Sequence, residues 1–331
     1  MDSPIERQCL SRVCRSRGGS YAWTPGCAQA GRAASAPGPN TKGIRVLKQI
    51  ILLLTCCFVL VNPVAKAETG TLAKIMETGQ ITLGYRGNTP PFSYLTQDDV
   101  VEGFSIDLCR VIARSVQERL KLEKLEIRYV PVTSENRLEA VADGRVDIEC
   151  GATTRTLSRQ KQVEFTHLTF VTGGTLLTTT DSGVESLFDL QDKSVAVTSG
   201  TTTQAALRQY LSNEMISATV LEVPTHSDGM RLLNDGKVAA YAADQVVLAA
   251  QALRETEGER YAMIEGTFSY EPYALVVRRD DADFLLAANT ALSRLFSSGD
   301  IMKLYQRWFS ELSPTPHPVL VALYKLQAIP E

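Results

Sequence analysis

The sequence has few of the residues from which metal and nucleotide sites are built. It contains only three histidines, and five of its seven cysteines lie within the first 57 residues, which leaves Cys109 and Cys150 in the rest of the chain. These residues do not have the spacing of metal ligands. A phosphate-binding loop, a zinc-protease motif and a nucleophile elbow are also missing. We therefore expect no metal site, no cofactor and no catalytic residue.

The sequence also lacks an apolar run long enough for a membrane span, which needs about 20 residues. The run at 50–61 ends at Asn62-Pro63, and Lys42, Arg45 and Lys48 precede it. Small residues typical of a cleavage site follow at Ala65-Lys66-Ala67. We therefore predict a signal peptide at 42–67, cleaved near Ala67 on export to the periplasm. A membrane anchor is the less favoured alternative.

Residues 1–41 show no apolar periodicity and are rich in Arg, Gly, Ala, Ser and Pro. Such a segment is typical of disorder, or of a start codon assigned too far upstream. We leave it out of the fold.

An excess of positive charge is missing as well. Nine of the 34 Lys and Arg and two of the 37 Asp and Glu lie in residues 1–67, which leaves 25 against 35 in the mature chain. Binding to nucleic acid requires a basic face, so nucleic acid is an unsuitable partner. Any positive field must be local.

The two remaining cysteines leave two alternatives open. In an oxidising compartment Cys109 and Cys150 can form one disulfide. Equally, one can be a buried free thiol on a helix and the other a buried thiol at the end of a strand. The sequence does not decide between them.

Apolar periodicity predicts an α/β fold with two lobes. Strands are expected at 81–85, 127–130 and 146–150 and helices at 104–120 and 137–143, an alternation that favours parallel strands. A second unit of the same kind is expected from strands at 194–198, 219–223 and 239–242 and helices at 202–211 and 229–233. Helices at 282–296 and 301–309 close the chain.

Two apolar, β-branched segments are expected to cross between the lobes, at 165–180, with Gly173-Gly174 in the middle, and at 273–277. We therefore assign 68–172 to lobe 1, 173–272 to lobe 2 and 273–331 to the C-terminal part of lobe 1. A cleft between two such lobes is a usual place for a small ligand.

One segment has the composition of an anion site. Residues 148–166 combine hydroxyls, a glycine and arginines at the end of a predicted strand, where backbone amides and Arg159 can converge on a carboxylate. Thr201 and Thr202 open a predicted helix, whose first N–H groups also favour an anion.

Several blocks resemble the polar-amino-acid family of periplasmic solute-binding proteins. They are Gly103-Phe104-Ser105-Ile106-Asp107-Leu108, residues 148–166, Asp189-Leu190-Gln191-Asp192-Lys193 and residues 197–202. A narrower likeness to the glutamate/aspartate branch lies in residues 131–137, 158–162 and 225–228. The resemblance covers roughly residues 71–309 and implies the two-lobed, type II periplasmic-binding-protein fold with two crossing strands.

The resemblance implies which residues hold the common part of an amino acid. Arg159 clamps the α-carboxylate with two hydrogen bonds, and Thr154 and Thr202 add to it, although each threonine can instead cap a helix. Asp244 pairs with the α-ammonium, although a carboxylate there can instead begin the next helix. Ala152 departs from the branch, which usually has Ser there, so that about 1 kcal/mol of hydrogen bonding can be lost.

Selectivity for an acidic side chain is implied for Arg86, Ser134, Arg137 and His226. Phe92 can pack on the ligand's methylenes, or simply on the core. Three arginines against Asp244 leave a net charge near plus two, which suits a dicarboxylic amino acid. Glutamate and aspartate differ by one methylene, about 1 kcal/mol, so the sequence does not rank them.

The resemblance thus implies an amino-acid ABC importer's binding protein, monomeric, that captures L-glutamate or L-aspartate by lobe closure and delivers it to a membrane permease. One alternative is a cleft enzyme of the prephenate or arogenate dehydratase kind, with Glu149 or Glu135 as general acid. Another is a ligand-sensing module, although the chain has no output domain of its own.

Overall fold

The computed structural model describes residues 69–255 and 260–330. The predicted disordered segment and signal peptide lie outside the described residues. Within the described part, two five-stranded sheets and a small three-stranded sheet are present. The three short strands of the small sheet are β2 (Asn88–Thr89), β3 (Ser93–Leu95) and β4 (Val101–Glu102).

The first five-stranded sheet has the order β5-β1-β6-β13-β7. Its strands are β1 (Gln80–Tyr85), β5 (Glu126–Pro131), β6 (Ile148–Glu149), β7 (Val163–Thr172) and β13 (Glu271–Arg278). Strand β1 pairs in parallel with β5 and β6, as the alternation of strands and helices predicts, whereas β13 runs antiparallel to β6 and β7. The sheet therefore joins segments that are far apart in the chain.

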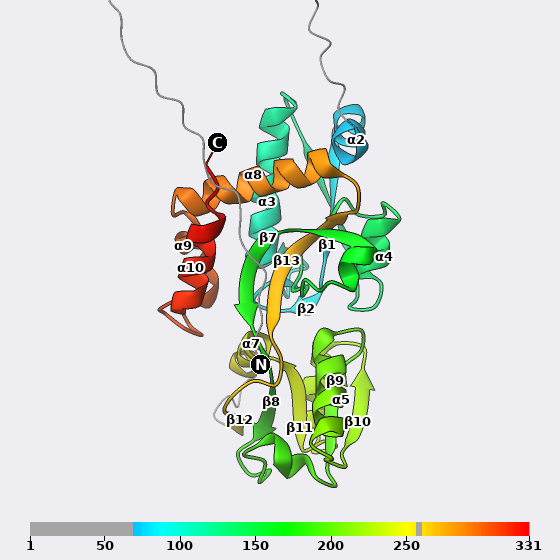
Figure 1. Ribbon diagram of the computed structural model, residues 1–331, viewed down its shortest axis with the longest axis vertical. Coiled ribbons are helices and arrows are strands. Elements are labelled where there is room, and N and C mark those ends of the chain that lie inside the picture. Colours follow the sequence, from blue (N-terminus) through cyan, green and yellow to red (C-terminus); the bar gives the residue numbers. More distant parts are fainter. Residues whose placement is uncertain (1–68, 256–259, 331) are drawn as a thin grey trace, which may run out of the picture. The chain divides into compact units, whose positions relative to one another are not determined.

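Alternating residues of β13 pack on opposite faces of this sheet. Leu275 and Val277 belong to one cluster with residues of α2 (Gly70–Thr78), α3 (Phe104–Arg119) and α8 (Ala282–Ser297). Ala274 and Val276 belong to another with residues of α4 (Arg137–Ala142). Because both of its faces are covered, the central part of β13 is apolar throughout. Figure 1 shows α3 and α8 on one side of the sheet and α4 on the other.

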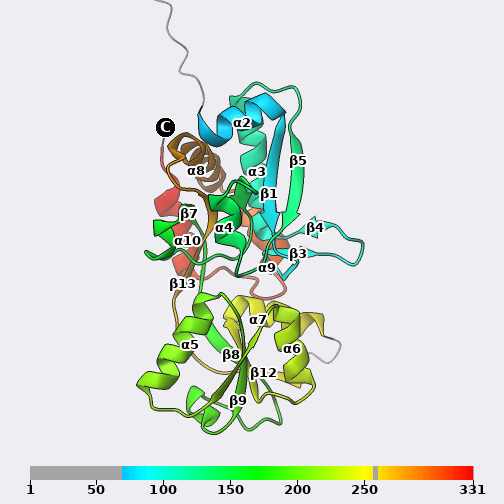
Figure 2. The ribbon, with the colours of Figure 1, turned by 90° about the vertical axis from the view of Figure 1, so that its right-hand side faces the viewer.

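The second sheet has the order β10-β9-β11-β8-β12. Its strands are β8 (Gly174–Thr179), β9 (Ser194–Thr198), β10 (Thr219–Val223), β11 (Ala240–Asp244) and β12 (Tyr261–Met263). Helix α5 (Thr202–Asn213) covers one face, and α6 (His226–Asn234) and α7 (Gln245–Arg254) cover the other. Figure 2 shows α7 on the side of this lobe that lies toward the first lobe.

The chain crosses between the two sheets where it was expected to. Strand β7 of the first sheet passes through Gly173 into β8 of the second, and β13 brings the chain back. A side chain at Gly173 would collide with the Ser269 carbonyl at 2.6 Å, so the two crossing segments touch there. The two-lobed α/β fold is confirmed, and residues 172/173 and 272/273 remain our proposed lobe boundaries.

Three expectations about elements need correction. Strand β6 is shorter than the predicted 146–150, and α6 begins at His226 rather than 229, which places His226 in a helix. Helix α7 and the C-terminal helix α10 (Pro318–Gln327) were not predicted. The short helix α9 (Ile301–Phe309) lies where it was expected.

Cys109 and Cys150 form a disulfide, which resolves the alternative that the sequence left open. The bond ties α3 to the chain just after β6. Both residues are fully buried in the core of the first lobe. Phe92 also belongs to that core, edge-on to Phe104 and Phe170, so core packing explains it.

Candidate ligand-binding site

A cavity of about 20 Å³ lies between the lobes. This is about the room that one water molecule needs and is well below the roughly 300 to 1,000 Å³ of small-molecule sites, so the lobes must separate for an amino acid to enter. Its lining comes from the ends of strands and the starts of helices: Arg86, Thr89, Arg137, Ala152, Thr154, Thr198, Thr201, Thr202, Thr203, His226, Ala242, Ala243, Asp244, Val247 and Tyr273. Ligands of open α/β sheets bind at these carboxyl ends of strands.

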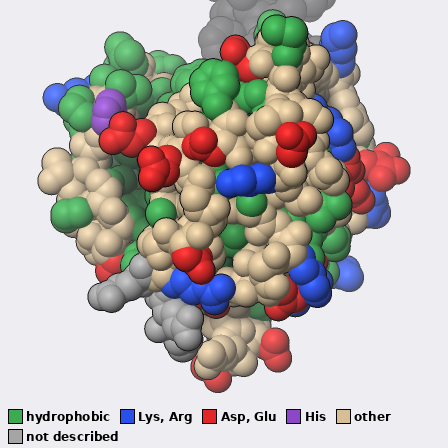
Figure 3. Space-filling view, turned by 90° about the horizontal axis from the view of Figure 1, so that it is seen from below, with side chains coloured by type: hydrophobic (Ala, Val, Ile, Leu, Met, Phe, Trp, Pro, Cys, Tyr) green, Lys and Arg blue, Asp and Glu red, His purple; other side chains and the backbone are tan. Residues whose placement is uncertain are grey.

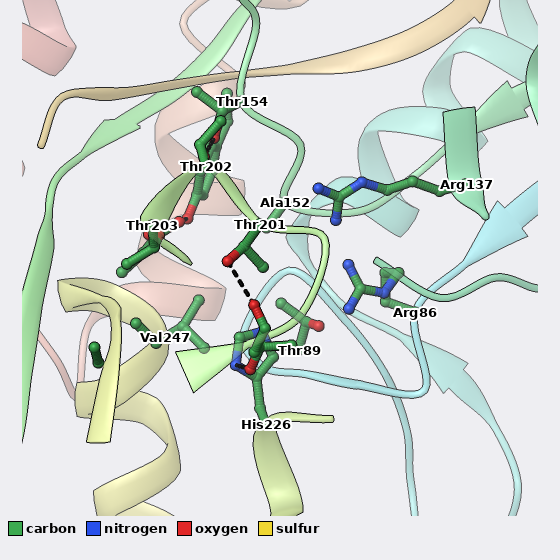
Figure 4. Close-up of a pocket in the computed structure, with 15 residues that line it drawn as sticks. Arg86, Thr89, Arg137, Ala152, Thr154, Thr201, Thr202, Thr203, His226 and Val247 are labelled. Atoms are coloured by element: carbon green, nitrogen blue, oxygen red, sulfur yellow. Dashed lines mark hydrogen bonds between the residues drawn. The ribbon is translucent and has the colours of Figure 1, made fainter. Parts of the chain in front are cut away.

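Arg86 and Arg137 reach the cavity from the first lobe. They are 3% and 2% exposed, and Figure 4 shows both guanidinium groups pointing toward the threonines of the second lobe. Arg86 donates a hydrogen bond of 2.7 Å from Nη2 to Ser134 Oγ, and Nε of Arg137 has no partner among the described residues. Burial, with repulsion from Arg137 next, lowers the pKa of Arg86 to about 9. Arg86 therefore stays cationic at neutral pH.

Glu149 is the internal counter-ion of this arginine pair. It is fully buried, accepts a 2.8 Å hydrogen bond from Thr153 at Oε2, and its Oε1 has no hydrogen-bond partner among the described residues. Burial lowers the pKa of Arg137, and the Glu149 carboxylate opposes that shift more than any other group. One carboxylate thus faces two guanidinium groups.

The hydroxyls of Thr154 and Thr202 meet at a second buried carboxylate. Each donates a 2.5 Å hydrogen bond to Oε2 of Glu271, the first residue of β13. Thr154 belongs to the first lobe and Thr202 begins α5 of the second. The N-cap of α5 is Thr201, whose hydroxyl accepts from Gln204 N, so the suggestion that Thr202 caps this helix is wrong.

Asp244 ends β11 and also faces the cavity. Its carboxylate accepts hydrogen bonds from the hydroxyls of Thr203 and Tyr273, and it makes no side-chain cap for α7. Burial, and then the negative charge of Glu271, raise its pKa to about 6. It is therefore mostly ionised at pH 7 but titrates close to neutrality.

Arg159 and Ser134 do not line the cavity. Arg159 donates from Nη1 to the Thr154 carbonyl at 2.8 Å and from Nη2 to the Gly200 carbonyl of the second lobe at 3.4 Å. Burial, with Arg137 next, lowers its pKa to about 10. It therefore stands behind Thr154 and bridges the lobes, whereas Ser134 supports Arg86.

His226 lines the cavity as a neutral group. Its Nδ1 lies 2.5 Å from the Tyr241 hydroxyl, and burial, followed by Arg86 and Arg137, lowers its pKa to about 3. The imidazole therefore brings no charge to the site, and its Nδ1 is held by Tyr241.

The expected net charge near plus two omitted two carboxylates. Among the described residues around the cavity, Arg86, Arg137 and Arg159 are balanced by Asp244, Glu149 and Glu271. The two signs are separated in space: Arg86 and Arg137 stand on one side, and the threonines that hold Glu271 and Asp244 stand on the other (Figure 4). The site is dipolar rather than uniformly positive.

Two of the residues that sequence reasoning missed, Glu271 and Tyr273, lie on the return crossing. Tyr273 lines the cavity, and Glu271 lies just behind it. Their only signal in the sequence is a charged and an aromatic residue, Glu271-Pro272-Tyr273, at the start of an apolar strand.

Comparisons with known proteins identify the family. A model of bacterial extracellular solute-binding proteins, family 3, matches residues 81–311. The chain belongs to this family. It is accordingly a solute-binding protein rather than an enzyme, and the dehydratase alternative is set aside.

Two curated relatives narrow the comparison. The chain is 33% identical to the L-glutamate/L-aspartate-binding protein of Pseudomonas aeruginosa, over 82% of this chain and 90% of that protein. It is 30% identical to the glutamate/aspartate import solute-binding protein of Escherichia coli K12, over 80% and 88%.

Solved structures agree on the fold. A mutant of ArgBP from T. maritima matches with a TM-score of 0.64 and 26% identity, over 72% of this chain and 99% of that one. A solute receptor for L-cysteine of Neisseria gonorrhoeae matches with a TM-score of 0.67 and 23% identity, over 76% and 98%, which bears on the fold alone. Among residues 69–255 and 260–330, no helix is long and apolar enough to cross a membrane.

Proposed function

We propose that this protein is the substrate-binding protein of an amino-acid ABC importer and that it captures L-glutamate or L-aspartate. The observation that carries the proposal is the pair of buried guanidinium groups of Arg86 and Arg137, which lie opposite the second lobe with Glu149 as one shared counter-ion. Relatives that share about a third of the sequence are named for the same two ligands.

The dipolar cavity suits the charge pattern of an acidic amino acid. A side-chain carboxylate placed between Arg86 and Arg137 supplies the second anion that this pair lacks. The α-ammonium then faces Asp244 on the opposite side. Glutamine in the same pose leaves the arginine pair short of an anion, and an uncompensated buried charge costs on the order of 3 to 5 kcal/mol.

The α-carboxylate is assigned to Arg159 and to the backbone N–H groups of Thr154 and Thr202, with Ala152 beside them. Arg159 reaches Thr154 by its carbonyl, so it adds positive field at this end and holds the two lobes together through Gly200. His226 faces the side-chain carboxylate from the second lobe, while Ser134 fixes Arg86.

Capture proceeds by lobe closure. Arg86, Arg137 and Thr154 belong to the first lobe, and Thr202, His226 and Asp244 to the second, so a ligand that contacts all of them bridges the cleft. Closure about the two crossing segments at Gly173 and Glu271 then excludes water from the ligand.

The protein acts outside the cytoplasmic membrane in this proposal. The signal peptide at 42–67 directs it to the periplasm, where it works as a monomer and delivers its ligand to a membrane permease. Nucleic acid is an unsuitable partner, because the mature chain carries 25 Lys and Arg against 35 Asp and Glu. On the face shown in Figure 3, acidic and basic side chains are interspersed.

A thermal-shift panel of the twenty amino acids tests the proposal on the exported protein, purified after expression of the full chain. A ligand at 100 times its dissociation constant adds about 2.7 kcal/mol of stability, or on the order of 5 to 10 °C in a domain of this size. We expect this shift for glutamate and aspartate. A larger shift with any uncharged amino acid contradicts the proposal.

A further inference from the structure

Glu271 is a buried carboxylate that the proposed ligand contacts do not include. It is 1% exposed, begins β13 where the chain returns to the first lobe, and does not line the cavity. Yet two of the threonines that do line it, Thr154 and Thr202, point their hydroxyl groups at the same oxygen of Glu271, at 2.5 Å each. Its other oxygen accepts 2.7 Å from Ser269 Oγ.

The direction of these hydrogen bonds is fixed by chemistry. An ionised carboxylate can only accept, and a threonine hydroxyl has a single proton to donate. Both threonine hydroxyls therefore donate their only proton to Glu271. Bonds of this charge-assisted kind are about twice as strong as neutral ones, so a neutral acceptor on a ligand, such as a keto oxygen, does not draw the protons away from Glu271.

What remains on each threonine oxygen is a pair of acceptor sites. Thr202 and Thr154 also lie 3.0 Å apart, so both oxygens border one small region of the cavity. An acceptor repels a carboxylate and attracts an ammonium group. The hydroxyls of Thr154 and Thr202 are therefore unsuited to the α-carboxylate to which the sequence assigned them, and that group must rely on Arg159 and on backbone N–H groups.

We propose that Glu271 is a positioning residue that turns Thr154 and Thr202 into hydrogen-bond acceptors and thereby makes the site select ligands that carry an amine. This inference rests on the proposed function, in that the ligand is an α-amino acid. It does not depend on which side chain that amino acid has.

The surrounding charges agree with this role. Glu271 contributes to the raised pKa of Asp244, and Asp244 holds the hydroxyls of Thr203 and Tyr273. Arg137 is the cation that opposes this shift. Glu271 and Asp244 thus form the negative side of the cavity, and the threonine oxygens present that negative character to the ligand.

The test compares a ligand that donates hydrogen bonds from its α-position with a ligand that can only accept hydrogen bonds there. L-Glutamate carries an ammonium and 2-oxoglutarate a keto oxygen at the same carbon, with the two carboxylates kept. Isothermal titration of the exported protein gives the ratio of their dissociation constants for the wild type, Glu271→Met, Glu271→Gln and the control Ser269→Ala. Ser269→Ala removes a partner of Glu271 but leaves both threonine bonds intact.

In Glu271→Met the threonine protons are free to turn to the keto oxygen, and we expect the preference for glutamate to fall about tenfold or more. Glu271→Gln keeps an acceptor oxygen for the threonines, so its preference should lie between those of Glu271→Met and the wild type. Ser269→Ala should keep the wild-type ratio.

Three results overturn the inference. Parallel weakening of both ligands shows a merely structural residue. An equal fall of the preference for glutamate in Glu271→Gln and Glu271→Met shows that only the charge of Glu271 matters and that the threonine hydroxyls play no part. If Glu271→Met does not fold, it is replaced by Thr202→Val, Glu271→Gln and the double variant. Effects of the two single changes on the ratio of dissociation constants that simply add in the double variant then contradict coupling between Glu271 and Thr202.

Failure of the proposed function has a different signature. If the wild type binds an uncharged amino acid and not glutamate or aspartate, the same ratio is measured with that amino acid and its 2-oxo acid. A fall in Glu271→Met then supports Glu271 while the acidic-ligand assignment is rejected. Absence of binding to every α-amino acid overturns both.

Discussion

The guanidinium of Arg86 is held by the hydroxyl of Ser134, 2.7 Å from Nη2 to Oγ, in a part of the first lobe where both residues are buried. Ser134 does not line the cavity, so its effect on a ligand passes through Arg86. The two residues come from different strand ends of one sheet, which brings the hydroxyl to the guanidinium.

Ser134→Ala should weaken the binding of glutamate and of aspartate about tenfold, since a hydrogen bond to a charged group contributes on the order of 1.5 kcal/mol. Calorimetric titration measures the loss. Ser310→Ala, at an exposed serine, is the control. Unchanged affinity in Ser134→Ala would show that Arg86 needs no such support.

Arg137→Ala should weaken the binding of glutamate a hundredfold or more. It should weaken any residual binding of glutamine much less. Its removal leaves the ligand's side-chain carboxylate without one of its two cations, and a desolvated charge that loses its partner costs about 3 to 5 kcal/mol. Arg128→Ala, at an exposed arginine on β5, is the matched control. Equal losses for the two ligands would show that Arg137 does not recognise the side chain.

Arg159→Ala should weaken every bound amino acid, because Arg159 acts near Thr154, at the end of the site that all amino acids share. The same panel of ligands applied to Arg155→Ala, an exposed arginine four residues earlier, controls for charge. A loss confined to acidic ligands contradicts the assignment.

Affinity should fall as the pH falls through about 6. Burial and Glu271 raise the pKa of Asp244 to that value, and below it the carboxyl is neutral and does not pair with the α-ammonium. Asp244→Asn should bind weakly without this step. His226 has a pKa of about 3 and does not titrate between pH 5 and 8. His226→Gln should therefore leave the midpoint of the affinity change near pH 6. A midpoint that moves in His226→Gln and persists in Asp244→Asn reverses the two roles.

Loss of the Cys109–Cys150 disulfide should lower stability without abolishing binding. The bond closes a loop with a sequence separation of 41, worth about 4 kcal/mol by the entropy of the unfolded chain. Cys109→Ala/Cys150→Ala is compared with the wild type by thermal denaturation and by glutamate titration. An unchanged melting temperature contradicts the expectation.

Much of the fold follows from local pattern. The strand at β1 and the helix α3 were predicted within a residue or two, because alternation and helical periodicity are properties of adjacent residues. The crossing at Gly173 was also predicted, from two glycines in a β-branched run. Helix α7 was given no range because it follows β11 without a loop, and only Asp244 indicated where a helix could begin.

The candidate site was less accessible to such reasoning. Arg137 and Asp244 came from family motifs, but Glu271 is 117 positions from Thr154, and only the return of β13 brings it there. The predicted net charge of the cavity was wrong for the same reason. Glu149 was considered only as a general acid and not as a counter-ion, and Glu271 reaches the site through tertiary contacts that no local pattern records.

The central claim is that two buried arginines on the first lobe select a second carboxylate. Its most direct test is the calorimetric affinity of the exported protein for L-glutamate and L-aspartate against L-glutamine, at pH 7.5 and one salt concentration. The account predicts that at least one of the two acidic amino acids binds a hundredfold or more tighter than glutamine. Glutamine binding as tightly as the better acidic ligand would contradict it.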